Sequence, residues 1–344
     1  MLKRWRWPSE QTRLLLSSFQ SEAHPHAFLL TGPEGAGKRT LAKIYVQALL
    51  CEALPERRPC GVCGACKRVE HDSHLDVTIV RPGEDPKSKS YTITIDQARG
   101  AISSLSHTAF EGRRKALIVH QAERMQPAAQ NALLKTLEEP PGDCVFFLIT
   151  DKRYDLLPTV RSRCVWTPVP TLGIGLAARV LVEHGMDARQ ADEAARFARG
   201  AVGYALRYAD EVAPIARRVR GALGGVRSIG GAPAAVKLLT SIYDEVKDPH
   251  ERAARASRIL ETMESIVRES LERLNPEPTT DDRLNMIERI ERAAPHTLLN
   301  MLDGIGDARR RLGMYISFPS IMDALIYLWL EDLYNAAGGR DQVS

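Results

Sequence analysis

The sequence lacks any long apolar run. None approaches the ~18–20 consecutive apolar residues that a helix needs to cross a membrane. The chain begins with a basic stretch, residues 1–18, whose apolar part is three leucines, too short for the core of a signal peptide. We therefore expect a cytoplasmic protein without membrane contact.

A strong charge of one sign is also missing, and aromatic residues are few. Lysine and arginine number 47 against 43 acidic residues, a net charge of +4, and aromatics make up 6% of the chain. This balance neither requires nor excludes nucleic acid. A hydrophobic fraction of 44% over 344 residues excludes a disordered chain and allows roughly two or three domains.

Cysteines are scarce, but four of the six stand close together. They follow the spacing C-x₈-C-x₂-C-x₂-C, at Cys51, Cys60, Cys63 and Cys66. In a cytoplasmic protein such a set favours a metal over disulfides, and four thiolates suit tetrahedral Zn²⁺. With all four ligands from the protein, we predict a structural zinc module at residues 51–66. For Cys144 the simplest interpretation is a small buried apolar residue.

Short apolar runs alternate with helical patterns in the first half of the chain. The strand-like runs are residues 27–32, 76–80, 115–120 and 144–150, and the helical patterns are residues 38–50 and 127–139. This alternation is typical of an α/β fold with a parallel sheet covered by helices. After about residue 168 only helical patterns remain. We expect an α/β domain at residues 1–168, a small helical lid at 169–212 and an all-helical domain at 213–344.

The segment GPEGAGK, residues 32–38, fits a phosphate-binding loop. It follows the first strand and opens a helix, so glycine-rich backbone and a helix N-terminus would face a polyphosphate. The residues expected at this nucleotide site are Gly32, Gly35, Gly37, Lys38, Arg39 and Thr40. Arg39 stands where a serine or threonine normally binds Mg²⁺. Thr40 is about 100° further round the helix, so the sequence argues against productive Mg·ATP binding.

The acidic pair that P-loop ATPases use is absent from the end of the strand at 115–119. His120 and Gln121 stand there instead. An imidazole is a poor ligand for Mg²⁺, and an amide cannot act as a general base. Glu123 is expected to be a solvated carboxylate. Hydrolysis of ATP by this chain is therefore not expected.

Four motifs in this order resemble one family. They are GPEGAGK, the cysteine spacing, NALLKTLEEPP (131–141) and LLPTVRSRC (156–164), and together they are similar to the AAA+ subunits of the bacterial clamp loader. The resemblance is dense over about residues 20–170. It implies a P-loop AAA+ α/β domain, a helical lid and a helical collar that assembles a ring. The degenerate loop most resembles that of the non-hydrolysing, stator-type subunit. Such a subunit would have no enzymatic activity of its own but would belong to a polymerase complex.

The resemblance also implies roles for single residues. Arg163 maps onto the arginine finger offered in trans to a neighbour's ATP, and Thr150 onto the polar sensor beside the γ-phosphate. Tyr204 stands where motor subunits carry a lid arginine, with Arg207 three residues on. Lys135 could touch DNA phosphate, although a solvated lysine is an equal alternative.

The implied partners are gamma or tau motor subunits, a delta subunit, the sliding clamp and, through the complex, primed DNA. Two other functions stay open at this point. One is an active ATPase motor of the same family, which would hold Mg²⁺ through Thr40 or Glu123. The other is a free-standing zinc-dependent nucleic-acid-binding protein, which the modest charge and scattered aromatics disfavour.

Overall fold

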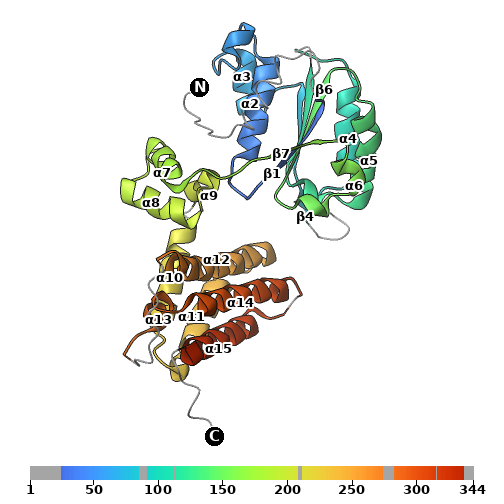
Figure 1. Cartoon of the computed structure of the whole chain (residues 1–344). Coiled ribbons are helices and arrows are strands. Elements are labelled where there is room, and N and C mark those ends of the chain that lie inside the picture. The colour runs from blue at the N-terminus through green and yellow to red at the C-terminus, as the bar shows by residue number, and fades with distance from the viewer. Residues whose placement is uncertain are drawn as a thin grey trace. The chain divides into compact units, whose positions relative to one another are not determined.

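Five apolar runs pair into one parallel sheet in the order β2-β5-β6-β1-β7 (Figure 1). The strands are β1 (Ala27–Thr31), β2 (Val77–Val80), β5 (Lys115–Val119), β6 (Cys144–Thr150) and β7 (Val165–Pro168). Because all neighbours are parallel, their carboxyl ends share one edge of the sheet, the edge at which open α/β folds bind ligands. The predicted α/β fold is confirmed.

Side chains alternate between the two faces of the sheet, as the period of a strand requires. Phe28 and Leu30 of β1 pack with α2 (Lys38–Leu50) and α3 (Gly64–Glu70) on one face. Leu29 packs on the other face with α4 (Ile95–Ser106) and α5 (Pro127–Glu138). The result is a three-layer arrangement (Figure 1), with a buried core on each side of the sheet.

Short elements complete this part of the chain. They are a hairpin of β3 (Gly83–Glu84) and β4 (Tyr91–Thr92), the one-turn helix α6 (Pro158–Arg161), and the helices α7 (Ile174–Glu183), α8 (Ala188–Phe197) and α9 (Val202–Arg207). A capping box starts α4, in which the Thr94 side chain accepts from the Gln97 backbone and Gln97 returns a bond to the Thr94 backbone.

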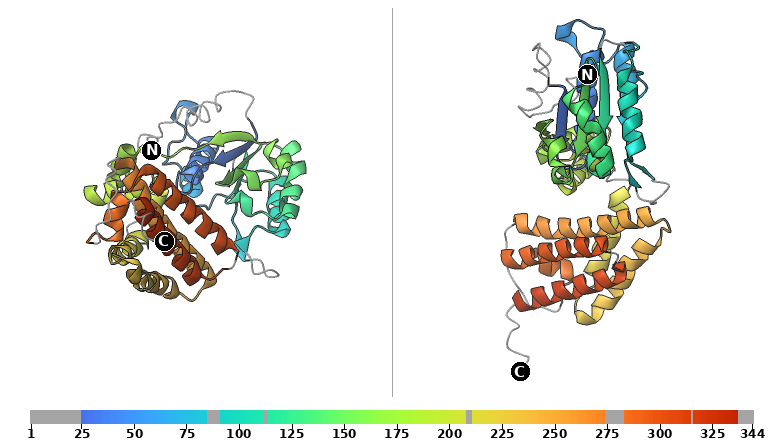
Figure 2. Two further views of the ribbon diagram at one scale, coloured as in Figure 1. Left: turned by 60° about the horizontal axis from the view of Figure 1, so that its bottom comes forward. Right: turned by 90° about the vertical axis from the view of Figure 1, so that its right-hand side faces the viewer.

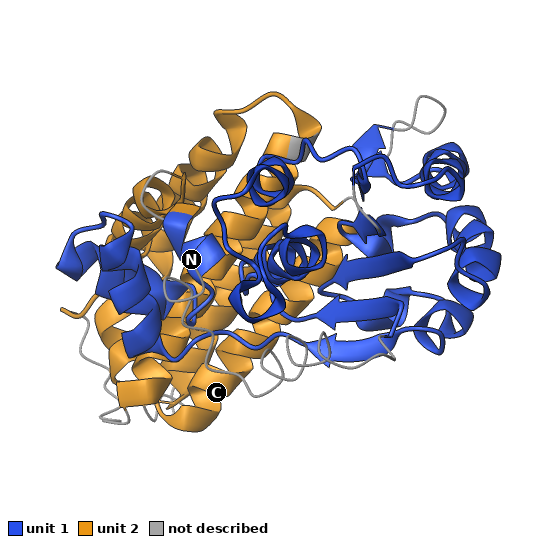
Figure 3. Ribbon diagram, turned by 90° about the horizontal axis from the view of Figure 1, so that it is seen from above, with its two compact units in different colours: residues 1–206 blue, residues 207–344 orange. Residues whose placement is uncertain are grey.

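The computed structural model describes residues 25–84, 91–111, 114–207, 211–273, 283–314 and 316–336. The basic start at residues 1–18 lies outside them. The chain divides into two compact units, Met1–Leu206 and Arg207–Ser344 (Figure 3). The first unit holds the sheet together with α7 to α9. The finer division into domains at 1–168, 169–212 and 213–344 stays a prediction.

The second unit is helical throughout its described residues. Its helices are α10 (Ala213–Gly224), α11 (Ala232–Asp244), α12 (Pro249–Arg273), α13 (Met286–Glu291), α14 (Pro295–Gly313) and α15 (Phe318–Ala336). Helix α14 lies between α12 and α15 (Figure 2), and Trp329 is fully buried in their shared core. Among the helices that the structure describes, none is long and apolar enough to cross a membrane.

Candidate nucleotide and metal sites

The loop at residues 32–38 connects β1 to α2 at the carboxyl edge of the sheet. Gly32, Gly35 and Gly37 have φ angles of 151°, 75° and 92°, a region that favours glycine. The Lys38 ammonium is folded back onto the loop, where it donates to the carbonyls of Gly32 at 2.5 Å and Pro33 at 2.8 Å. Burial lowers the pKa of Lys38, while the nearby carboxylates of Asp151 and Glu123 oppose this shift. The loop thus has the form of a phosphate loop with its lysine turned inward.

Helix α9 packs its backbone directly against this loop. The Gly203 N–H donates to the Gly35 carbonyl at 2.9 Å. A Cβ on Gly35 would lie 2.3 Å from the backbone nitrogen of Tyr204, so only glycine fits there. The Tyr204 ring stacks on Phe197, with ring centroids 6.1 Å apart. Sequence reasoning identified Tyr204 as a departure from motor subunits, but gave no sign that its backbone contacts the loop.

Arg39 is engaged in an ion pair with Asp72. Together with Lys43 and Arg81 it surrounds the carboxylate of Asp72, with Arg81 Nη2 2.6 Å from Oδ2. Burial alone would raise the pKa of Asp72, but the hydrogen bond from Lys43 and the charges of Lys43 and Arg39 outweigh it and lower the pKa. The residue in the Mg²⁺-ligand position therefore carries a guanidinium that is already paired.

His120 follows β5 and is neutral at physiological pH. Burial, with the charges of Arg39 and Arg81 in the same direction, lowers the pKa of its imidazole to about 4. Gln121 next to it has a positive φ of 49° and is exposed. Neither side chain offers the hard anionic oxygen that Mg²⁺ prefers.

The expectation that Glu123 is solvated is wrong. Its side chain is half-buried beside Thr150 and Asp151, and burial raises the pKa of its carboxyl group, with Asp151 acting in the same direction. Thr150 ends β6 opposite Thr31 of β1 and is almost fully buried, and its Oγ1 accepts from the Lys152 N–H at 3.0 Å. The turn after β5 brings Glu123 back to the strand ends, which spacing along the chain does not reveal.

The four predicted cysteines converge. The sulfur atoms of Cys51, Cys60, Cys63 and Cys66 all lie within 4.8 Å of one another, and those of Cys51 and Cys63 are 4.0 Å apart. A tetrahedral zinc site with bonds of 2.3 Å places its sulfur atoms about 3.8 Å apart, so the donor set fits such an ion. The cluster could hold a metal ion.

Backbone N–H groups stabilise the thiolate form of one cysteine in this cluster. Val62 and Cys63 donate to Cys60 Sγ at 3.5 and 3.3 Å and lower the pKa of that thiol to about 6. Burial instead raises the pKa of Cys66. Hydrogen bonds to the ligand atoms of a metal site hold those ligands in place.

One stripe of α2 ties the cysteine module to the phosphate loop. Arg39, Lys43, Gln47 and Cys51 are four residues apart and so share a helix face. Gln47 Nε2 donates to the Cys66 carbonyl at 2.9 Å, Lys43 Nζ donates to the Glu70 carbonyl at 2.8 Å, and Arg39 pairs with Asp72. We call these contacts of residues 39, 43 and 47 the α2 clasp. No signal in the sequence predicted the α2 clasp, because its partners lie 19, 27 and 33 residues further along the chain.

Arg163 follows α6 and is held by α5. Its Nε donates to Glu138 Oε1 at 2.7 Å, its Nη2 pairs with the same carboxylate, and its Nη1 donates to the Thr159 carbonyl at 2.8 Å. A third of the Arg163 side chain remains exposed. Lys135, on the same helix as Glu138, is exposed.

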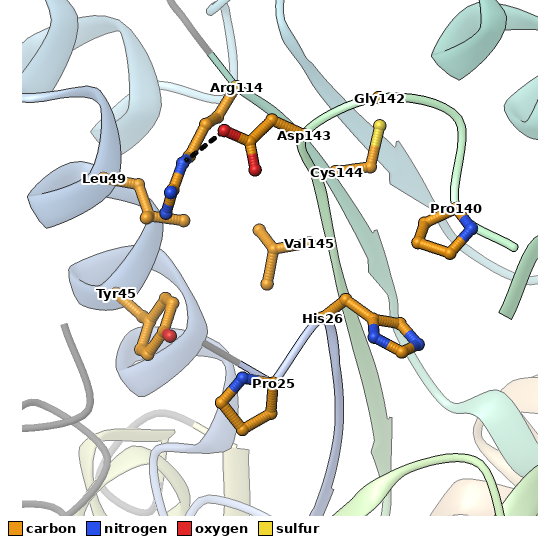
Figure 4. A pocket seen from close by; sticks show the side chains of 10 residues that line it. All are labelled: Pro25, His26, Tyr45, Leu49, Arg114, Pro140, Gly142, Asp143, Cys144 and Val145. Carbon is orange, nitrogen blue, oxygen red and sulfur yellow. Dashed lines mark hydrogen bonds and ion pairs between the residues drawn. The ribbon is translucent and has the colours of Figure 1, made fainter. Parts of the chain in front are cut away.

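A separate hollow of about 180 Å³ opens near the amino ends of β1 and β6 (Figure 4). Tyr45, Leu49 and Cys144 line it, and Arg114 donates to Asp143 at 3.1 Å beside it. Cys144 is buried as predicted, with its thiol donating to the Pro141 carbonyl at 2.9 Å. The hollow lies at the opposite edge of the sheet from the phosphate loop.

Known proteins match this chain mainly over its first unit. Residues 7–172 match the family model described as DNA polymerase III, delta subunit. Over 150 residues the chain is 42% identical to the DNA polymerase III subunit delta' of Pseudomonas aeruginosa, a match that covers 44% of each chain. It is 35% identical over 158 residues to the subunit delta' of Escherichia coli, which covers 46% of each chain.

A subunit with a different name matches at lower identity. The chain is 33% identical over 153 residues to the DNA polymerase III subunit tau of Bacillus subtilis, covering 44% of this chain and 26% of that protein. Each of these three matches spans less than half of the relative's length. Over residues 7–172 the chain is therefore similar to the DNA polymerase III delta-prime subunits, as its motifs suggested.

Proposed function

We propose that the chain is the delta-prime stator subunit of a bacterial DNA polymerase III clamp loader. It would act in the cytoplasm with gamma or tau motor subunits and a delta subunit to load the sliding clamp onto primed DNA. The observation that carries this proposal is the ion pairing of Arg39 with Asp72, next to the neutral His120. A paired guanidinium and an imidazole stand where Mg²⁺ and its ligands would be needed for hydrolysis.

In this function Arg163 completes the ATP site of a neighbouring motor subunit. A guanidinium supplied in trans stabilises the charge that develops on the transferred phosphoryl group. The Arg163 side chain supports this role, because a third of it is exposed. Helix α5 would face the path of primed DNA, where Lys135 would contact phosphate.

The cysteine module would hold one structural Zn²⁺ through Cys51, Cys60, Cys63 and Cys66. The ion would fix a segment that has few apolar residues of its own. Removal of a structural zinc ion destabilises the fold around it.

An active ATPase motor is the second candidate. Glu123 favours it, since this carboxylate lies close enough to Lys38 to act on the pKa of its ammonium group, and Asp151 lies close enough to raise the pKa of Glu123. In a motor, Glu123 would take the place of the missing acidic residues. Against it stands Arg39, because no hydroxyl follows Lys38 to share a metal ion.

The deciding experiment is an ATPase assay on the reconstituted complex. The motor subunits carry a substitution of their own trans arginine, so that the site completed by this chain is the only complete one. Arg163→Ala should lower kcat at that site by about 10³-fold, as expected for a missing arginine finger. The isolated wild-type chain should show no turnover with Mg·ATP.

Arg114→Ala is the matched control. Arg114 pairs with Asp143 and has a similar exposure, but it lies at the opposite edge of the sheet. Equal kcat values for the wild type and Arg163→Ala would refute the finger. Robust turnover by the isolated wild type, abolished by Glu123→Gln, would favour the motor.

A further inference from the structure

Glu138 meets Arg163 along one edge of the guanidinium group. The Nε and Nη2 atoms both donate to Glu138 Oε1, and Nη1 donates to the Thr159 carbonyl. A guanidinium has five N–H groups in a rigid plane. The contacts with Glu138 and Thr159 use three of them, and Nη1 also donates to Ser162 Oγ at 3.5 Å, so one remains for an anion outside the chain.

The position of Glu138 is unfavourable for its own helix. Glu138 is the last residue of α5, where the partial negative charge of the helix end repels a carboxylate. Lys135 is the basic residue of this last turn, and no lysine or arginine follows Glu138 before Pro140. The contact with Arg163, 25 residues further along the chain, supplies a second positive charge directly at the carboxylate.

The arginine approaches from a short and well-defined segment. Helix α6 is one turn long and is followed by Ser162, whose N–H bonds to the Pro158 carbonyl at 3.0 Å. The Arg163 N–H bonds to the Val160 carbonyl at 3.2 Å, so the backbone at Arg163 is fixed on α6. With the backbone fixed, only the torsion angles of the long Arg163 side chain can vary, and the contacts with Glu138 and Thr159 limit them.

We propose that Glu138 is a positioning residue that holds Arg163 in the orientation needed for its action in trans. The inference rests on the proposed arginine finger. Glu138 fixes the side edge of the guanidinium, and the end that stays free can point at a phosphate. Such orientation contributes to rate because the entropy of the side chain is lost before the reaction.

The same contact does not lock the arginine permanently. The Arg163 and Glu138 side chains are 33% and 48% exposed, and ion pairs with this exposure are weak. A neighbouring subunit can therefore adjust the guanidinium without a large penalty. The contact with Glu138 is therefore suited to orienting Arg163 and not to keeping it away from a neighbouring subunit.

The test uses the same reconstituted complex, in which only the site completed by this chain is active. Glu138→Gln keeps the shape of the side chain and removes its charge. It should lower kcat about tenfold, less than Arg163→Ala, with little change in KM for ATP. In the double variant, Glu138→Gln should add nothing to Arg163→Ala, because Glu138 acts only through Arg163.

Glu139→Gln is the matched control, since this exposed neighbour follows Glu138 directly. It should behave as the wild type in assembly, thermal stability and kcat. A second readout needs no partner. The Nε–H signal of Arg163 in NMR spectra of the isolated chain, identified by its loss in Arg163→Lys, should exchange slowly with water in the wild type and in Glu139→Gln, and fast in Glu138→Gln.

The outcomes separate this inference from the proposed function. If Arg163→Ala abolishes turnover but Glu138→Gln equals or exceeds the wild type, Glu138 is not a positioning residue and the finger stands. An additive loss in the double variant would also overturn the inference, because Glu138 would then act independently. If Arg163→Ala has no effect, the proposed function fails and the inference fails with it.

Discussion

Single residues decide what the carboxyl edge of the sheet can do, and His120 is the clearest case. Its pKa of about 4 in the fold lies below the ordinary value of 6.5. Between these values the unfolded chain binds a proton that the folded chain does not, so stability falls as the pH drops from about 6.5 to 4. The free energy of unfolding should therefore fall by roughly 2 kcal/mol between pH 7 and pH 4.5 because of His120, and His120→Asn should remove this part of the fall, measured by urea unfolding at the two pH values.

His107→Asn is the control for this prediction. His107 is an exposed histidine at the end of α4, whereas His120 follows β5. It should leave the pH dependence of the unfolding free energy nearly as in the wild type. If His120→Asn does the same, the imidazole of His120 is not held neutral by its surroundings.

Residue identities were easier to predict than residue partners. The glycines of the loop and the four cysteines were identified because their chemistry depends on spacing along a short segment. Glu123 was misjudged, and the role of Arg39 was missed, because their neighbours come from distant segments. Asp72 lies 33 residues from Arg39, and no local pattern links them.

At the scale of elements, the α2 clasp couples the cysteine module to the helix that carries the phosphate loop. Asp72→Asn should leave Arg39, Lys43 and Arg81 close together without their carboxylate, at a cost of about 1–2 kcal/mol. The backbone should tolerate the change, because Asp72 has a φ of 56° and asparagine favours that region. If the four cysteines hold a metal ion, its chelation should likewise speed amide hydrogen exchange in α2, measured by mass spectrometry.

Asp192→Asn is the control for the clasp, since it removes a surface carboxylate paired with Arg196 alone. It should change stability by a few tenths of a kcal/mol and leave exchange in α2 unchanged. Exchange in α5, on the other face of the sheet, should change little on chelation. Equal acceleration in α2 and α5 would mean that the metal supports the whole fold and not this helix.

Most elements of the sheet and its helices could be predicted, because buried strands and amphipathic helices have clear periodicities. The predicted strand at residues 144–150 and helix at 38–50 agree with β6 and α2. The patterns missed α4 and β7. Helix α4 has few large apolar residues, although its capping box was a readable signal. Strand β7 has four residues, ends in Pro168 and lies at the edge of the sheet, where a strand needs little apolar character.

At the scale of the whole molecule, the two units have separate cores. The cores on the sheet draw only on residues up to Val169, and the core of the second unit only on residues from Ile215 onward. Periodicity predicts where such cores begin and end. It does not predict the contact of α9 with the phosphate loop, which depends on glycine at positions 35 and 203 on two distant segments.

Separate cores predict separate unfolding transitions. Leu133 on α5 and Leu260 on α12 are almost fully buried, each in the core of its own unit. Replacing either by alanine should cost about 2–5 kcal/mol through lost burial and the cavity left behind. In calorimetry of the full chain, Leu133→Ala should lower one transition by about 5–15 °C, and Leu260→Ala should lower the other by a similar amount. A single transition that both changes lower equally would mean that the units unfold as one cooperative body, because neither core could then be lost without the other.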